Sequence, residues 1–209
     1  MFAHRKAAIA GQHGLVRAVV AWHVRGMTLT IRPALSSDVE ALSILKLTAF
    51  RQTFIDGFAV PYPPADLAQF EQESYGVDRV AAELADPTHA TWVAQDADGA
   101  LLAYAHVGPC KLPHPDASAD QGELYQLYAL NAAQGQGMGG ALMRVAMDWL
   151  AAAMPGPVWL GVWSGNHRAQ AIYGRAGFMK VGEYGFRVGS WTDHEYIFRR
   201  DGADHPDKR

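Results

Sequence analysis

The chain has 209 residues, of which 49% are hydrophobic and 19% charged, so it can form one globular domain with a sizeable core. A formal net charge of −3 provides no broad basic surface, which argues against nucleic acid as a partner. The single cysteine, Cys110, excludes an intramolecular disulfide and a cysteine-rich zinc site and favours a cytoplasmic location, and no apolar run reaches the roughly 20 residues that span a membrane.

The first 26 residues contain four Lys or Arg residues, and no acidic residue precedes Asp38, which superficially resembles a targeting segment. Arg17 interrupts the apolar stretch, and no small-residue cleavage site follows. We therefore expect a disordered or helical extension here, with Met27 as an alternative start of the chain. The predicted extension covers 1–26, the predicted globular domain 27–201 and the predicted polar tail 202–209.

From Met27 onward, segments with strand and helix periodicity alternate along the chain. Strands are predicted at 27–34, 89–95, 101–107, 123–130, 158–163, 181–188 and 196–200. Helices are predicted after a capping box formed by Ser37 and Glu40, at 65–84 with a break near Gly76, at 138–154 and at 167–175. Proline-bearing loops are predicted at 56–66 and 111–121. This order indicates a single α/β domain with a mixed, mostly antiparallel central sheet flanked by helices.

A glycine-rich turn, Gln134–Gly140, lies between a predicted strand and the long helix at 138–154 and contains four glycines in seven residues. Successive backbone N–H groups at a helix N-terminus bind phosphate, and the helix dipole adds about half a positive charge there. A diphosphate is therefore the expected ligand. The alternative is a tight turn that only needs positive φ angles.

The spacing Gly135-x-Gly137-x-x-Gly140 also matches the dinucleotide fingerprint of oxidoreductases. The context argues against that class. Residues 131–134 separate the strand from the glycines, and the end of the next strand, 162–165, carries no acidic residue for a ribose.

The stretch LYALNAAQGQGMGGALM resembles the signature of the GNAT superfamily of N-acetyltransferases, Gln or Arg followed by x-x-Gly-x-Gly, through Gln134, Gly137 and Gly139. A second block, LGVWSGNHRAQAIYGRAGF, is similar to the family's second element through Asn166, Ala169, Tyr173, Gly177 and Phe178. The resemblance is strongest over 123–178. The segment LTAFRQTFIDGFAVPYPPADLAQF also resembles the branch that acetylates polyamines and other small amines.

The resemblance implies a GNAT-like fold whose sheet strands splay at an acyl-CoA site, with acetyl-CoA as cosubstrate and no metal. Pantetheine would pair with the backbone of the strand before the glycine turn, and the diphosphate would lie on the turn itself. The implied cofactor-binding residues are Leu127, Tyr128, Ala129, Gln134, Gly135, Gln136, Gly137, Met138, Gly139, Gly140, Asn166, Ala169 and Tyr173.

The resemblance also implies two catalytic residues. Glu123, eleven positions before Gln134, is the candidate base, and the backbone N–H of Ala129 is the candidate oxyanion donor. Glu123 could equally be a strand-entry residue that faces solvent or pairs with a basic side chain, and a water chain or Tyr125 is an alternative base. Another subset of the family has a carboxylate five residues before the matched Asn. In this chain that position, five residues before Asn166, is Gly161.

Tyr173 is the candidate acid that protonates the leaving thiolate, and an aromatic anchor on its helix is the alternative role. Asn166 stands at a strand-to-helix junction, where helix capping and cofactor contact are both open. The histidines at 106, 114 and 194 have no metal-ligand spacing and are expected on the surface or in loops.

We expect an acceptor pocket formed by the loops at 56–66 and 111–121 and by the final hairpin at 185–195. Negative charge for a cationic amine would come from Asp56, Asp66, Glu123 and Asp193. The predicted activity is direct acetyl transfer from acetyl-CoA to a primary amine of a small polyamine-like molecule. The alternatives are a protein or peptide N-acetyltransferase and a non-catalytic CoA-binding regulatory module. The chain is expected to be a monomer or a homodimer.

Overall fold

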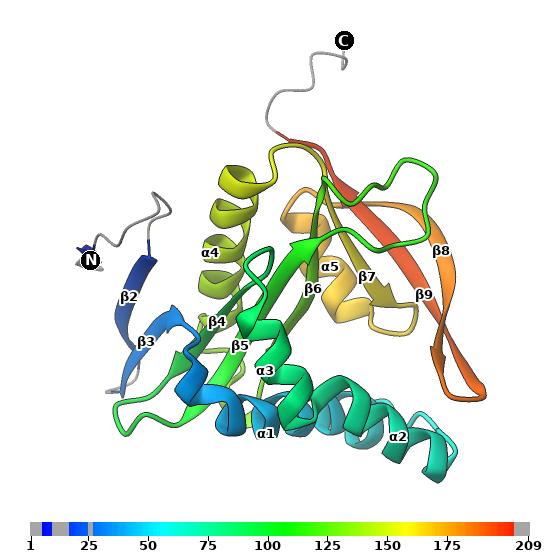
Figure 1. The fold of residues 1–209 in the computed structure, drawn as a ribbon, viewed down its shortest axis with the longest axis horizontal. Coiled ribbons are helices and arrows are strands. Elements are labelled where there is room, and N and C mark those ends of the chain that lie inside the picture. The colour runs from blue at the N-terminus through cyan, green and yellow to red at the C-terminus, as the bar shows by residue number, and fades with distance from the viewer. Residues whose placement is uncertain (1–5, 10–16, 25–26, 203–209) are drawn as a thin grey trace.

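The structure, a computed structural model, describes residues 6–9, 17–24 and 27–202. A central sheet is covered by helices on both faces (Figure 1). The strands are β1 (Lys6–Ile9), β2 (Arg17–Val24), β3 (Met27–Pro33), β4 (Ala90–Gln95), β5 (Leu101–Pro109), β6 (Gly122–Ala129), β7 (Val158–Trp163), β8 (Met179–Val188) and β9 (Trp191–Arg200). The α-helices are α1 (Val39–Phe50), α2 (Pro64–Tyr75), α3 (Val77–Ala85), α4 (Met138–Ala153) and α5 (His167–Arg175).

The strands lie in the order β1-β2-β3-β4-β5-β6-β7-β9-β8. Every neighbouring pair is antiparallel except β6 and β7, which are parallel. This parallel pairing is confined to Gly122 with Val158 and Glu123 with Trp159. Beyond Glu123 the two strands separate, so the sheet is mixed, mostly antiparallel and splayed in its middle, as the sequence predicts.

Alternating residues of the central strands pack against different helix layers. Trp92, Ala103 and Ala105 belong to the core under α4, whereas Val93 and Tyr104 pack with α1 and α3. The most buried residues of α4 are Met138, Leu142, Met143, Ala146 and Leu150, which face the core. The two layers hold the splayed strands between them, which fixes the walls of the opening.

The N-terminal region differs from the expected disordered or helical extension, because residues 6–9 and 17–24 form strands. β2 pairs with β3 from Val20↔Ile31 to Val24↔Met27. The segment RAVVAWHV is rich in valine, and β-branched residues favour strands once a sheet edge is available for pairing. Of the predicted polar tail, residues 203–209 lie outside the described part of the chain.

The predicted capping box at Ser37 and Glu40 is wrong. A short turn at Ser36–Asp38 precedes α1, and the carboxylate of Asp38 accepts the N–H of Leu35 at 2.7 Å. Asp38 also accepts hydrogen bonds from Nη1 and Nη2 of Arg32, at 2.6 and 2.9 Å, so it connects β3 to the start of the helix. Asp38, which lies between the two predicted residues, therefore stabilises the entry to the helix through Leu35 and Arg32.

The helices after α1 largely match the expected pattern. The long helical segment breaks at Gly76, where an added Cβ would lie 2.5 Å from the carbonyl oxygen of Gln72. The loop predicted at 56–66 is shorter than expected, because η2 (Arg51–Gly57), a π-helical segment, continues α1, and α2 begins at Pro64. No helix in the described part of the chain combines the length and apolar character that a membrane crossing requires.

Candidate active site

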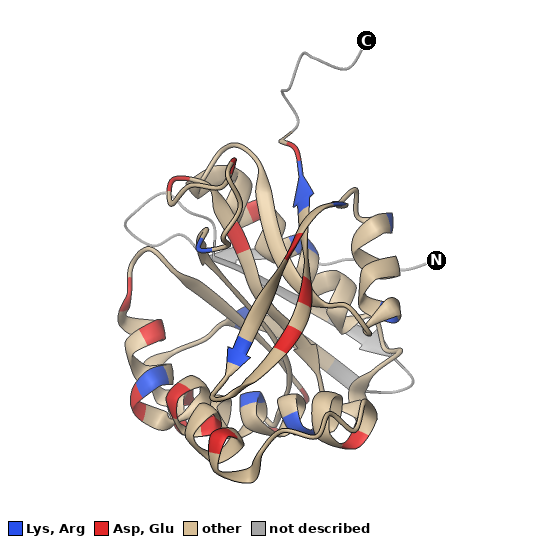
Figure 2. Ribbon diagram, turned by 90° about the vertical axis from the view of Figure 1, so that its right-hand side faces the viewer, with Lys and Arg blue, Asp and Glu red and all other residues tan. Residues whose placement is uncertain are grey.

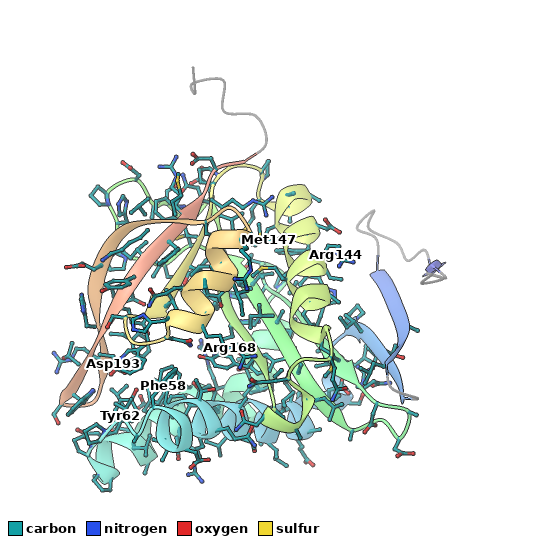
Figure 3. The ribbon with its side chains drawn as sticks, turned by 180° about the vertical axis from the view of Figure 1, so that it is seen from behind. Phe58, Tyr62, Arg144, Met147, Arg168 and Asp193 are labelled. Carbon is teal, nitrogen blue, oxygen red and sulfur yellow. The ribbon has the colours of Figure 1, made fainter. Side chains whose placement is uncertain are left out.

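A cleft of about 1300 Å³ opens where β6 and β7 separate. One part is lined by the N-terminal end of α4 and by α5, and another by η2, α2 and the β8–β9 hairpin. In Figure 3, Phe58, Tyr62 and Asp193 lie near one another at the hairpin side, while Arg168 projects from α5. The three segments predicted for the acceptor pocket all contribute lining residues, including Phe58, Leu112 and Asp193.

The glycine-rich turn is at one end of this cleft and leads into α4. Gly137 is the N-cap of α4 with φ of +84°, and Gly135 has φ of +77°, a region that other residues rarely adopt. The N–H of Ala141 donates to Gly137 O, so the N–H groups before it in the first turn have no partner within the helix. At Gly139 and Gly140 an added Cβ would meet no protein atom, so this turn leaves room for the oxygens of a diphosphate in front of its amides.

Arg168, a residue that the sequence did not single out, adds positive charge beside this turn. Its Nη1 donates to Oε1 of Gln134 at 2.7 Å. The amide nitrogen of Gln134 donates in turn to Oδ1 of Asn131 at 3.1 Å and to the carbonyl oxygen of Ala129 at 3.4 Å. The Gln134 side chain thus links α5, the turn and the end of β6 through hydrogen bonds.

The cleft edge of β6 has free main-chain groups. Leu130 donates its N–H to Leu102 O on the β5 side, and N–H directions alternate along a strand. Leu127 and Ala129 therefore point their N–H groups away from β5 and into the cleft. Tyr128 points its N–H towards β5, and its ring, stacked on Tyr104 with centroids 5.9 Å apart, lines the cleft.

Glu123 occupies the last paired position of β6 before the strands separate. Its side chain is buried, with 7% exposure for the residue, and its Oε2 accepts the N–H of Lys111 at 2.7 Å. Burial raises the pKa of Glu123 to about 7, which outweighs the stabilising hydrogen bond from Lys111. The alternative in which Glu123 faces solvent is therefore wrong. Tyr125 donates its hydroxyl to Pro109 O, which engages this alternative proton carrier elsewhere.

Tyr173 lies on α5 and lines the same cleft. Its half-buried ring packs edge-on against Phe178, with centroids 6.1 Å apart, and burial raises the pKa of its phenol to about 12. The phenol is therefore protonated at neutral pH and can donate a proton. Asn166 caps α5, because its Oδ1 accepts the N–H of Ala169 at 3.0 Å, and Ala169 packs against the core.

The hairpin wall carries carboxylates. Asp193 is 5% exposed and accepts hydrogen bonds from Tyr62 Oη at 2.5 Å and Trp191 Nε1 at 2.9 Å. Glu195, two residues further along β9, accepts the hydroxyl of Tyr184 at 2.6 Å and also lines the cleft. The sequence prediction included Asp193 but did not single out Glu195.

Two other acidic residues predicted for the pocket, Asp56 and Asp66, are not among its lining residues. Asp66 instead accepts the N–H of Ser190 at 2.9 Å, so it holds the turn of the hairpin. Asp56 lies near the end of η2 and Asp66 near the start of α2, so both are close in sequence to lining residues without lining the cleft themselves.

His106 is buried in β5, contrary to the expected surface or loop position. It is 3% exposed, its Nδ1 lies 2.8 Å from Thr91 Oγ1, and its ring stacks on His89 with centroids 5.3 Å apart. Within the described ranges, no group of three or more His, Cys, Asp or Glu residues is arranged to hold a metal ion.

The family model described as "Acetyltransferase (GNAT) family" matches residues 47–178. An uncharacterized N-acetyltransferase of Mycobacterium bovis is 33% identical over 152 residues, 69% of this chain and 90% of that protein. One from Lactobacillus delbrueckii subsp. lactis is 23% identical over 150 residues, 72% of this chain and 86% of that protein.

The fold is also that of the PaiA N-acetyltransferase from Thermoplasma acidophilum, whose crystal structure is a complex with coenzyme A. The TM-score is 0.64 at 18% identity, and the match covers 83% of this chain and 98% of that one. The free β6 edge and the glycine turn agree with this likeness. The chain thus belongs to the acetyltransferase (GNAT) family and is an acetyl-CoA-dependent N-acetyltransferase.

Proposed function

We propose that this N-acetyltransferase acetylates a primary amine of a small, polyamine-like molecule by direct transfer in a ternary complex. The observation that carries the proposal is the pairing of two unlike ends in one cleft. The glycine turn and Arg168 form a positive end beside Tyr173, whereas Glu123, Asp193 and Glu195 form a negative region beside aromatic rings.

The positive end is suited to the diphosphate of coenzyme A. The amides of Gly135–Gly140 and the start of α4 would hold its oxygens, and the N–H groups of Leu127 and Ala129 would pair with pantetheine. The relative from T. acidophilum, which was crystallised with coenzyme A, supports this placement by its fold.

The chemistry follows from the groups around the point where the strands separate. An alkylammonium has a pKa of about 10.4, so the amine must lose a proton before it attacks the thioester carbon. Glu123 accepts that proton, directly or through water. The N–H of Ala129 donates to the oxyanion, the C–S bond then breaks, and the Tyr173 hydroxyl protonates the thiolate.

The acceptor class follows from charge and shape. Aromatic rings from Phe58, Tyr62, Tyr128 and Trp163 line the cleft and can cover an alkyl chain, while the carboxylates attract ammonium groups. A free peptide N-terminus or a lysine side chain also supplies an amine. Each is attached to a peptide backbone, whereas the aromatic rings of the cleft are suited to an alkyl chain.

The test is thiol release from acetyl-CoA with matched panels of polyamines, amino acids, aminoglycosides and short peptides. We expect the highest kcat/KM with aliphatic polyamines. Release with peptides alone would replace the small-amine proposal by the peptide alternative. Tight coenzyme A binding without release on any panel would contradict turnover and favour a regulatory module.

A further inference from the structure

Buried acidic side chains outside the cleft are paired with basic ones. Asp38 lies 2.6 Å from Arg32, and Glu71 lies 2.5 Å from Arg51. Such pairing offsets the cost of removing a carboxylate from water. The fold therefore supplies a cation wherever burial of an acid serves structure alone.

Three acids of the cleft, Glu123, Asp193 and Glu195, differ from this pattern, whereas Glu83, which also lines the cleft, is paired with Lys46 and Arg79. No side-chain nitrogen of a Lys, Arg or His in the described part of the chain lies within 4 Å of the carboxylates of Glu123, Asp193 or Glu195. Burial is the largest cause of the raised pKa of both Glu195 and Glu123, and hydrogen bonds, with the charge of Lys111 in the case of Glu123, lower these pKa values. These carboxylates also act on one another, since Asp193 raises the pKa of Glu195 and Glu195 raises the pKa of Glu123 by smaller effects. Unpaired, mutually repelling carboxylates favour a cationic ligand.

Among the three, Glu195 is the one placed to contact such a ligand. Asp193 already accepts hydrogen bonds on both oxygens, Oδ1 and Oδ2, from Trp191 and Tyr62. Glu195 accepts one hydrogen bond, from Tyr184 on Oε2, and no donor within the described ranges reaches its Oε1. Glu195 thus has an oxygen available for an ammonium group.

The position of the Glu195 carboxylate depends on a glycine. Glu195 lies on β9 between two strands. It is paired with Trp163 of β7 on one side and with Tyr184 of β8 on the other. A Cβ added to Gly161 of β7 would lie 2.8 Å from Oε2 of Glu195 and 2.8 Å from the hydroxyl of Tyr184. The absence of a side chain at 161 therefore gives the Glu195–Tyr184 pair its place over β7.

We propose that Glu195, oriented by Tyr184 over Gly161, binds a second ammonium group of the acceptor and so makes diamines the preferred substrates. This inference rests on the proposed function, in which the reacting nitrogen lies at Glu123. The carbon chain between the two nitrogens would follow the aromatic wall that includes Trp163. Figure 2 shows acidic positions on the strands of the β8–β9 hairpin.

The test compares α,ω-diaminoalkanes of three to six carbons with the n-alkylamines of the same lengths. Thiol release gives kcat and KM, and calorimetry on the coenzyme A-saturated protein gives acceptor binding without turnover. The variants are E195Q, which removes the charge and keeps the shape, and G161A, which displaces the carboxylate and the phenol. The control is E183Q, which removes a charge from β8 at an exposed residue that is not part of the large cleft.

For E195Q we expect a rise of about 10- to 100-fold in the KM and Kd of diamines, from the loss of one charge-assisted contact. The KM of the monoamines and of acetyl-CoA should stay unchanged, as should all constants in E183Q. G161A should copy E195Q. Equal effects on monoamines and diamines, or no effect on diamines, would overturn the role of Glu195.

The two proposals fail in different ways. Thiol release from amino acids or peptides alone, without binding of diamines, overturns both the role of Glu195 and the small-amine class. Diamine binding that depends on Glu195, in a protein that releases no thiol with any amine, keeps the role of Glu195 and rejects the proposed function.

Discussion

Replacement of Glu123 by Gln tests the proposed base most directly. The side chain keeps its size and can still accept the N–H of Lys111, but it cannot take a proton. Burial raises the pKa of Glu123 from an ordinary 4.5 to about 7, so the ionised form in the folded chain costs about 3 kcal/mol more than in water. A base with a pKa near the working pH is effective, because it is ionised and still basic.

In the wild type, kcat/KM should therefore rise with pH through an apparent pKa near 7, below the further rise from deprotonation of the free amine. In E123Q we expect this first rise to vanish and kcat to fall by about 10²- to 10⁴-fold, the usual contribution of general-base catalysis. D148N, which removes a carboxylate from an exposed position on α4, is the control and should keep both. An E123Q enzyme with the wild-type rate and pH profile would refute Glu123 as the base.

The same pKa shift has a consequence for stability. Because the pKa of Glu123 is higher in the folded chain, the folded chain binds more protons than the unfolded chain between about pH 4.5 and 7. The contribution of Glu123 to the free energy of unfolding is thus largest below pH 4.5 and decreases by up to about 3 kcal/mol as the pH rises to about 7. Urea unfolding of wild type and E123Q at pH 5 and pH 8 should show this difference between the two proteins.

Three further substitutions test other parts of the site. Y173F should lower kcat by about 10²-fold or more, measured as thiol release up to pH 10, because a phenol with a pKa of about 12 stays protonated over that range; an unchanged rate would remove its role as acid. G137A should lose about 1 kcal/mol or more of stability from its φ of +84° and also raise the KM for acetyl-CoA. G99A, at φ of +87° in the β4–β5 turn, should share only the loss of stability, and equal KM values in both would contradict the diphosphate site. R168Q should raise the KM for acetyl-CoA and reduce its dependence on salt, whereas R144Q on α4 (Figure 3) should do neither, and identical behaviour of the two would refute a specific role for Arg168.

The parts of the site that the sequence predicts are those in which a backbone shape demands a residue type. The turn at Gln134–Gly140 needs glycine where φ is positive, and the start of α5 needs a cap, which Asn166 provides. Both demands are local, so both can be read from a few neighbouring residues. The strands and helices around them were also predictable, because their periodicity is long and regular.

The parts that the sequence does not predict depend on contacts between distant segments. Glu195 meets Gly161 because β9 pairs with β7 in one particular register, and a shift of one residue would turn its side chain to the opposite face. Arg168 reaches Gln134 across 34 positions, and His106 is buried because β4 and the helices cover it. The alternation of Asp193 and Glu195 was the one available signal, since residues two apart on a strand share a face.

A single structural feature produces both halves of the cleft. The pairing of β6 with β7 ends at Glu123, so the edge of β6 beyond it keeps free N–H groups on the side of the glycine turn. On the other side of the opening, Gly161 of β7 lies next to the carboxylate of Glu195 on the neighbouring strand β9. In the proposed function, the anionic cosubstrate and the cationic acceptor would meet where the strands separate, and each would be repelled from the other's end of the cleft. On this proposal, charge would order the two substrates along the cleft, with the thioester directed towards Glu123 and the amine arriving from the hairpin.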